Sequence, residues 1–144
     1  MTNLDKVLDL PHHVSIMVIE DDAMVRAIVV EYLQTFGFTR ISAPDSSSEA
    51  VVSLLDEKLS YDLVLSDWQM PQVNGLEVLR LCKKLAHRRA TKFIMITSQV
   101  PEEKDKIAKA RAEGVDGYIL KPFKGKLLRS KIWEVLGWRN ASVA

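Results

Sequence analysis

Short apolar runs and longer helical patterns alternate along most of this chain, and this alternation limits the possible fold more than any other feature. The apolar runs are rich in β-branched residues and have the length of buried strands. The helical patterns place apolar residues three and four positions apart. Five strands alternating with five helices predict an α/β fold, with a parallel sheet covered by helices on both faces. The expected strands are 15–19, 39–42, 62–66, 92–97 and 117–120. The expected helices are 25–36, 78–86, 102–113 and 124–136, together with a helix that is capped by Asp45 or Ser46 and ends at 55.

The composition fits one globular domain. The chain has 144 residues, of which 47% are hydrophobic, and this is enough for a full core. We expect the domain to span 15–137, with an amino-terminal extension at 1–14 and a carboxyl-terminal tail at 138–144. The net charge is +1, which argues against a nucleic-acid-binding module because such modules usually carry a marked basic excess.

Cysteine and hydrophobic content exclude further classes. Cys82 is the only cysteine, so the chain can form neither an internal disulfide nor a cysteine-based zinc site. No run approaches the roughly 18 apolar residues that suggest a transmembrane helix. The first residues contain acids and no long apolar stretch, unlike a signal peptide. We therefore expect a soluble, cytoplasmic protein without a membrane partner.

Charged and hydroxyl side chains follow the expected strands, at the edge of the sheet where proteins of this class bind ligands. Carboxylates brought together repel one another, and a bound Mg²⁺ removes that repulsion. A carboxylate is also a nucleophile toward phosphorus, and a cation, a lysine and a hydroxyl stabilise the transferring phosphoryl group. The cluster therefore predicts Mg²⁺-dependent phosphoryl transfer. Its members are Glu20, Asp21, Asp22, Asp67, Thr97, Ser98 and Lys121, with Pro122 after the lysine.

Each member of this cluster also has a structural interpretation. Acids that follow a strand often cap the next helix, and Asp22 is the candidate for that role. A Lys–Pro pair such as Lys121–Pro122 is often a turn, and a threonine such as Thr97 at a strand end is usually structural. The occurrence of all of them at successive strand ends favours the functional interpretation.

Other functions on a similar sheet need residues that this chain lacks. A phosphatase with an aspartyl nucleophile needs a second Asp two residues after the first, where this chain has Gln69. A flavin-binding electron carrier needs a hydroxyl-rich and glycine-rich loop after the first strand, where this chain has three acids that would repel phosphate. Two alternatives remain, a non-phosphorylated scaffold and a piece of a larger regulator. The intact acidic site argues against the scaffold, whereas nothing in the sequence argues against the larger regulator.

Four segments resemble the receiver domains of two-component response regulators, and among them the free-standing chemotaxis type. The resemblance covers about 15–136. It implies a flavodoxin-like, doubly wound (βα)5 fold in which the parallel five-stranded sheet has the order 2-1-3-4-5. The segments are VIEDDAMVR at 18–26, DWQMPQVNGLEVLR at 67–80, MITS at 95–98 and GYILKPF at 117–123.

The resemblance also implies a role for each matching residue. Asp67 is the phosphoacceptor, and Mg²⁺ is the cofactor. Asp21 would bind the metal directly and Glu20 mainly through water, together with Asp67 and the backbone carbonyl of Gln69. Thr97 and Lys121 would contact the phosphoryl group, and Thr97 and Tyr118 would act as the switch. A cis bond would precede Pro122, and Gln69 and Gln99 would tune dephosphorylation.

The resemblance further implies the partners. A histidine kinase or a phosphotransfer protein would donate the phosphoryl group, and a downstream target protein would bind a face formed by 102–113, 117–120 and 124–136. The chain would be a monomer or a phosphorylation-dependent homodimer in chemotaxis or a phosphorelay. It would not be a conventional enzyme, because it would catalyse only its own phosphorylation and dephosphorylation.

Two further segments carry expectations about packing. Helix 102–113 has few large apolar residues, so we expect only a thin face of it to be buried. The basic run from Lys83 to Arg89 is expected to face solvent and the carboxyl end of its own helix. Trp133 and Trp138 are expected to pack against the domain.

Overall fold

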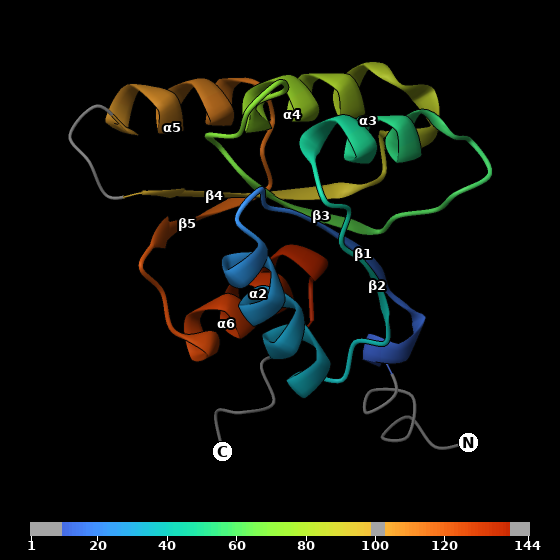
Figure 1. Ribbon diagram of the computed structural model, residues 1–144, viewed down its shortest axis with the longest axis vertical. Coiled ribbons are helices and arrows are strands. Elements are labelled where there is room, and N and C mark those ends of the chain that lie inside the picture. The colour runs from blue at the N-terminus through green and yellow to red at the C-terminus, as the bar shows by residue number, and fades with distance from the viewer. Residues whose placement is uncertain (1–9, 99–102, 139–144) are drawn as a thin grey trace.

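The computed structural model describes residues 10–98 and 103–138, and five parallel strands form one sheet with the order β2-β1-β3-β4-β5 (Figure 1). The predicted α/β, flavodoxin-like fold and its strand order are confirmed. The strands are β1 Ser15–Ile19, β2 Arg40–Ser42, β3 Leu63–Asp67, β4 Lys92–Ser98 and β5 Gly117–Lys121; the helices are α2 Ala23–Thr35, α3 Ser47–Leu55, α4 Gly75–Lys84, α5 Glu103–Ala112 and α6 Gly125–Leu136, with short 3-10 helices η1 Leu10–His13 and η2 Ala86–Arg88.

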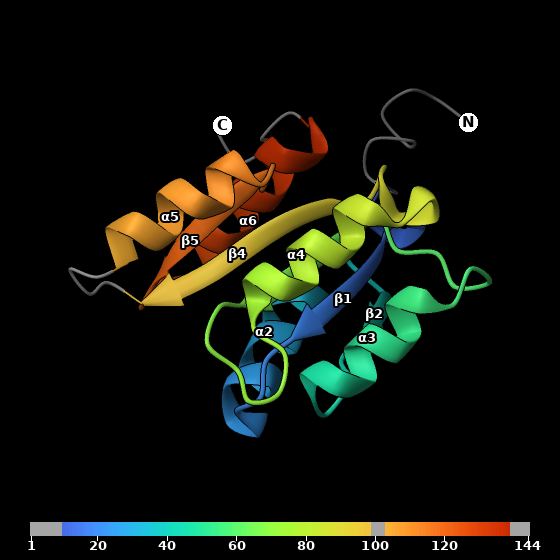
Figure 2. The same cartoon turned by 90° about the horizontal axis from the view of Figure 1, so that it is seen from above.

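Helices cover both faces of the sheet, with α2 and α6 on one side and α3, α4 and α5 on the other (Figures 1 and 2). Successive residues of a strand point to opposite faces, so the two sides have separate cores. Ile16 and Val18 pack in the core under α2 and α6, whereas Met17 and Ile19 pack in the core under α3 and α4. Burial on both faces explains why the strands are apolar runs without polar alternation.

The side chains at the helix ends explain where the helices begin and end. Asp22 caps α2 by accepting hydrogen bonds from the backbone N–H groups of Met24 and Val25, as expected from the sequence. Of the two candidates for the cap of α3, Ser46 holds that position. Because these caps fix the first turns, the residues before them stay at the strand ends, where the acidic cluster lies.

The prediction that the basic run from Lys83 to Arg89 faces solvent and the end of its own helix is wrong for Arg88. Its side chain is only 2% exposed, and it donates hydrogen bonds to the carbonyls of Leu54 (2.9 Å) and Asp56 (2.8 Å) at the carboxyl end of α3. Helix α4 ends at Lys84, and the chain then turns into η2, which directs Arg88 toward α3. Its charge therefore stabilises the end of a neighbouring helix and not of its own.

Aromatic side chains close the core at the carboxyl end of α6. Trp138 stacks on Phe38 with ring centroids 6.0 Å apart, and it meets Trp133 edge to face at 5.0 Å. The expectation that both tryptophans pack against the domain is confirmed. On the opposite face, Ala110 is the single buried residue among the described side chains of α5, which agrees with a thin apolar face.

None of the helices in the part of the chain that the structure describes is long and apolar enough to span a membrane.

Candidate functional site

Three carboxylates meet at the carboxyl edge of the sheet. Glu20 and Asp21 follow β1, and Asp67 is the last residue of β3, the neighbouring strand. One carboxylate oxygen of each lies within 4.8 Å of those of the other two. Glu20 and Asp67 are buried, at 6% and 9% exposure, whereas Asp21 is open to solvent. Such a set of convergent oxygen ligands with one open side is suited to a hard divalent cation.

Lys121 lies between two of these carboxylates. Its Nζ is 3.2 Å from Glu20 Oε2 and 3.1 Å from Asp67 Oδ2. Lys121 is the last residue of β5, and the peptide bond between Lys121 and Pro122 is cis. The lysine therefore compensates part of the negative charge that the strand ends bring together.

The pKa values of these groups reflect burial and their neighbours. Burial, followed by the charge of Asp67, raises the pKa of Glu20 from 4.5 to about 7. Burial alone would lower the pKa of Lys121, but the carboxylates of Asp67 and Glu20 outweigh burial and raise it. Lys121 is therefore charged at neutral pH. Ionising Glu20 in the folded protein costs free energy, because its carboxylate is buried beside Asp67.

A cavity of about 130 Å³ opens beside the phosphoacceptor candidate. Thr97, which is 2% exposed, reaches this cavity from β4, the strand next to β3. The cavity is therefore bordered by Asp67, by the Lys121 side chain that pairs with it, and by the buried Thr97. Its lining residues are Asp67, Trp68, Gln69, Thr97, Ser98 and Lys121.

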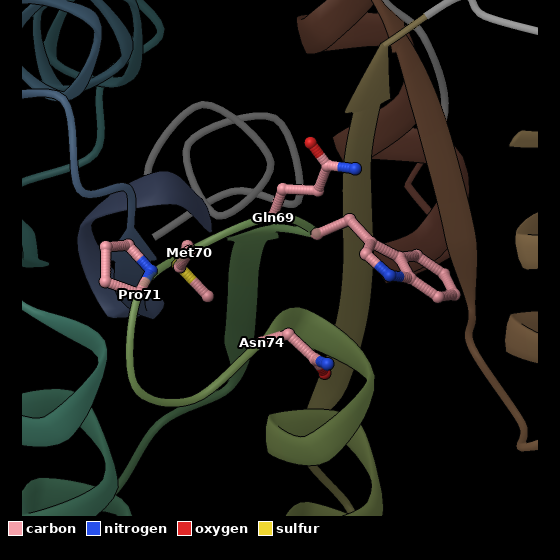
Figure 3. Close-up of a pocket in the computed structure, with 5 residues that line it drawn as sticks. Gln69, Met70, Pro71 and Asn74 are labelled. Atoms are coloured by element: carbon pink, nitrogen blue, oxygen red, sulfur yellow. The ribbon is translucent and has the colours of Figure 1, made fainter.

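A second, larger cavity of about 530 Å³ lies along the loop between β3 and α4 (Figure 3). Gln69 belongs to both cavities, and its side-chain amide extends away from Met70 and Asn74 in Figure 3. The lining residues of the larger cavity are Trp68, Gln69, Met70, Pro71 and Asn74.

Backbone contacts hold this loop against the end of β3. The N–H of Trp68 donates to Asp67 Oδ1 at 2.8 Å, and the N–H of Gly75 donates to the carbonyl of Trp68 at 2.8 Å. A methyl group at Gly75 would overlap the carbonyl oxygen of Asp67 and the sulfur of Met95. The first residue of α4 therefore has to be glycine for the helix to approach Asp67 this closely.

The switch residue that the resemblance implies, Tyr118, does not line the smaller cavity. Tyr118 lies on β5, and its hydroxyl accepts a hydrogen bond of 2.6 Å from Arg111 of α5, whose guanidinium also lies 5.1 Å from the ring centroid. Tyr118 packs against the core under α3, α4 and α5. Gln99 is not among the described residues.

The sequence did not single out three residues that the structure places at the site. Trp68 directly follows Asp67, and its backbone N–H donates to the Asp67 carboxylate at 2.8 Å. Arg26 lies within one of the four segments that resemble receiver domains, and it donates a hydrogen bond of 2.8 Å to the carbonyl of Glu20. Ser47 of α3 contacts the loop after β3, and nothing in the sequence pattern indicates that contact.

Known proteins share this fold and this sequence pattern. The model of the response regulator receiver domain family matches residues 16–133. The chain is 30% identical over 123 residues to chemotaxis protein CheY-3 of Vibrio cholerae, covering 85% of this chain and 92% of that protein. It is 36% identical over 121 residues to the phosphate regulon transcriptional regulatory protein PhoB of Klebsiella pneumoniae, covering 84% of this chain and 51% of that protein.

A solved structure supports the fold. It is the receiver domain of a sensor histidine kinase from Pseudomonas aeruginosa, with a magnesium ion coordinated in its active site cleft. It superimposes with a TM-score of 0.74 at 23% identity, covering 85% of this chain and 97% of that one. Sequence and fold agree, and the chain belongs to the response regulator receiver domain family.

Proposed function

We propose that this chain is a phosphorylation-switched response regulator in which Asp67 accepts a phosphoryl group from a histidine kinase or a phosphotransfer protein. The observation that carries the proposal is the position of Asp67. Its buried carboxylate ends β3, pairs with Lys121 at 3.1 Å and borders the small cavity that Thr97 also lines. Receiver domains interact with histidine kinases and are usually not enzymes apart from their own phosphorylation chemistry.

The residues present fit a magnesium ion. Asp21, Asp67 and the backbone carbonyl of Gln69 would hold the ion, with Glu20 acting mainly through water. The close approach of the three acidic oxygens supports this assignment, because hard divalent cations prefer such ligands. When bound, the ion would supply positive charge to the oxygens of the incoming phosphoryl group.

The side chains divide the remaining chemistry. An oxygen of the Asp67 carboxylate forms a bond to phosphorus while the bond from phosphorus to the donor nitrogen breaks, and the donor histidine leaves. Lys121 changes its partner from the carboxylates to a phosphoryl oxygen. The Thr97 hydroxyl donates to another of these oxygens, so the new charge is held by a cation and a hydroxyl in a buried site.

The output would be a changed affinity for a target protein. Movement of Thr97 would let Tyr118 turn, and this would alter the face formed by α5, β5 and α6. Gln69, beside Asp67 in the cavity, and Gln99 would tune the lifetime of the phosphorylated state. A role in chemotaxis or a phosphorelay, a cytoplasmic location and the choice between monomer and homodimer all belong to this proposal.

The test of the proposal is the intact mass of the protein after incubation with acetyl phosphate. We expect a single phosphoryl adduct in the presence of Mg²⁺ and none when EDTA replaces the metal. An adduct that forms equally well in EDTA would contradict the magnesium site. No adduct under any condition would favour the alternative of a non-phosphorylated scaffold.

An exposed apolar row beside the site supports docking of a phosphodonor protein. Met24 and Ile28 of α2 are 75% and 47% exposed, and they lie in one row with Tyr32 at helical spacing. The Tyr32 ring abuts Gly125 at the start of α6, where Leu127 is 49% exposed. Both helices begin just after site residues, so a protein bound to this row would reach Asp67.

Met24→Asp is expected to lower the rate of phosphotransfer by about tenfold or more, because a charge replaces an apolar contact. The donor in this measurement is a histidine kinase that phosphorylates the parent. Phosphorylation by acetyl phosphate, measured by intact mass, should be unchanged. Val52→Asp is the matched control, since Val52 is 69% exposed on α3, across the sheet. Equal slowing by both variants would show that the row is not the docking surface.

A further inference from the structure

The first turn of α3 contacts the loop that follows the phosphoacceptor, although it contributes no side chain to the acidic cluster. The hydroxyl of Ser47 donates a hydrogen bond of 2.8 Å to the carbonyl of Pro71 and accepts one of 3.3 Å from the N–H of Val73. Ser47 is 2% exposed, so these two bonds are protected from water. The adjacent Ser48 hydroxyl pairs with the side-chain carbonyl of Gln72.

The backbone that Ser47 contacts has an uncommon conformation. The N–H of Val73 also donates to the carbonyl of Pro71 at 2.8 Å, and Gln72 between them has a φ of 72°. A hydrogen bond across two residues with a positive central φ is a γ-turn of the rare, strained kind. For a residue with a side chain, such a conformation is costly and persists only where its surroundings impose it. Ser47 bonds both ends of this turn.

The same turn lies close in sequence to the proposed metal ligand, Gln69. Gln69 precedes Pro71 by two residues, and the loop closes where the Gly75 N–H donates to the Trp68 carbonyl at 2.8 Å. The loop thus has one anchor at its base, next to Asp67, and a second at the turn, supplied by α3. A loop that loses the second anchor can relax the turn and shift the carbonyl of Gln69.

The start of α3 is also joined to Glu20 and Asp21, the acidic pair that follows β1. Arg26 of α2 donates a hydrogen bond of 2.8 Å to the carbonyl of Glu20 and forms an ion pair of 3.4 Å with Asp45. Asp45 lies two residues before Ser47. The segment from Asp45 to Ser48 therefore contacts both sides of the site, the acidic pair through Arg26 and the phosphoacceptor loop through Ser47.

We propose that Ser47 is a positioning residue for the magnesium site: its hydroxyl holds the 71–73 turn and thereby keeps the Gln69 carbonyl in reach of the ion that Asp21 and Asp67 bind. This inference rests on the proposed function. Residues that orient metal ligands without touching the metal typically change metal affinity by about 10-fold to 100-fold when they are removed.

The experiment compares Ser47→Ala with the parent and with Ser53→Ala, a partly buried serine of the same helix. Isothermal titration with MgCl₂ is expected to give a dissociation constant about tenfold higher for Ser47→Ala and unchanged for Ser53→Ala. Phosphorylation by acetyl phosphate should recover toward the parental rate at saturating Mg²⁺. Amide hydrogen exchange in a peptide covering 69–74 should be faster in Ser47→Ala alone.

The results separate this inference from the proposed function. A lowered melting temperature with a parental magnesium affinity would make Ser47 a purely structural residue and overturn the inference, while phosphorylation of the parent would leave the proposed function standing. Equal affinities for Ser47→Ala and Ser53→Ala would overturn it too. A parent that binds no Mg²⁺ would overturn both.

Discussion

Asp67→Asn is expected to take up no phosphoryl group from acetyl phosphate in the presence of Mg²⁺, under conditions in which the parent gains a single adduct. An amide is not a nucleophile toward phosphorus, and the change also removes one negative charge from the metal site. Asparagine keeps the size of a side chain that is only 9% exposed, so the fold should be retained. Intact mass spectrometry measures the result directly.

Asp22→Asn is the matched control for that variant. Asp22 is an exposed acid that directly follows Glu20 and Asp21 in the sequence, and its carboxylate caps α2. Asparagine caps helices about as well as aspartate, so this variant should fold and be phosphorylated like the parent. If Asp67→Asn still gained an adduct, the phosphoacceptor would be another residue. If Asp22→Asn gained none, the assignment of metal binding to Glu20 and Asp21 without Asp22 would be wrong.

Without divalent metal, the protein is expected to lose stability as the pH rises from about 4.5 to about 7, and Glu20→Gln should remove this loss. The folded-state pKa of Glu20 is about 7, above its ordinary 4.5, so folding favours the protonated form. The contribution of Glu20 to the free energy of unfolding is fully present below pH 4.5, and it is lost as the pH rises through 7. The shift corresponds to about 3 kcal/mol in the free energy of unfolding.

Urea unfolding in EDTA at about pH 5 and about pH 8, on either side of the Glu20 transition, measures this effect. The quantity of interest is the difference in pH dependence between the parent and Glu20→Gln, because the two proteins share every other ionisable group. Glu31→Gln, at an exposed position of α2, controls for removal of a surface charge. Adding Mg²⁺ at the higher pH should restore stability to the parent. The same pH dependence in parent and Glu20→Gln would contradict a strained carboxylate at this site.

The sequence was sufficient for the strands and for most of the site because both depend on short-range patterns. Apolar runs that are buried on both faces have a distinctive composition, and polar residues directly after them must lie at one edge of a parallel sheet. Asp67 ends β3 and Lys121 ends β5, and their side chains meet at 3.1 Å. The position of Asp22 as a helix cap followed from the same local reasoning.

Contacts between distant segments could not be predicted in this way. Arg88 pairs with carbonyls more than 30 positions earlier, and its sequence neighbours are basic residues that suggest an exposed surface. Ser47 meets the backbone 24 and 26 positions later. A serine at the start of a helix is usual, and a γ-turn has no sequence signature as strong as that of a strand. These contacts depend on how the packed helices place their first and last turns.

The three tryptophans are divided between the two ends of the molecule, and this gives the protein a built-in optical reference. Trp68 adjoins the phosphoacceptor candidate and lines both cavities. Near the far end of α6, by contrast, Trp138 stacks on Phe38 and Trp133 meets the same ring edge to face. Trp133 is the ninth residue of α6, about 12 Å along the helix from Gly125, and Trp138 follows the end of the helix, so both lie well away from Lys121, which precedes α6. Emission changes on metal binding or phosphorylation would therefore come from one indole, over a constant background from the other two.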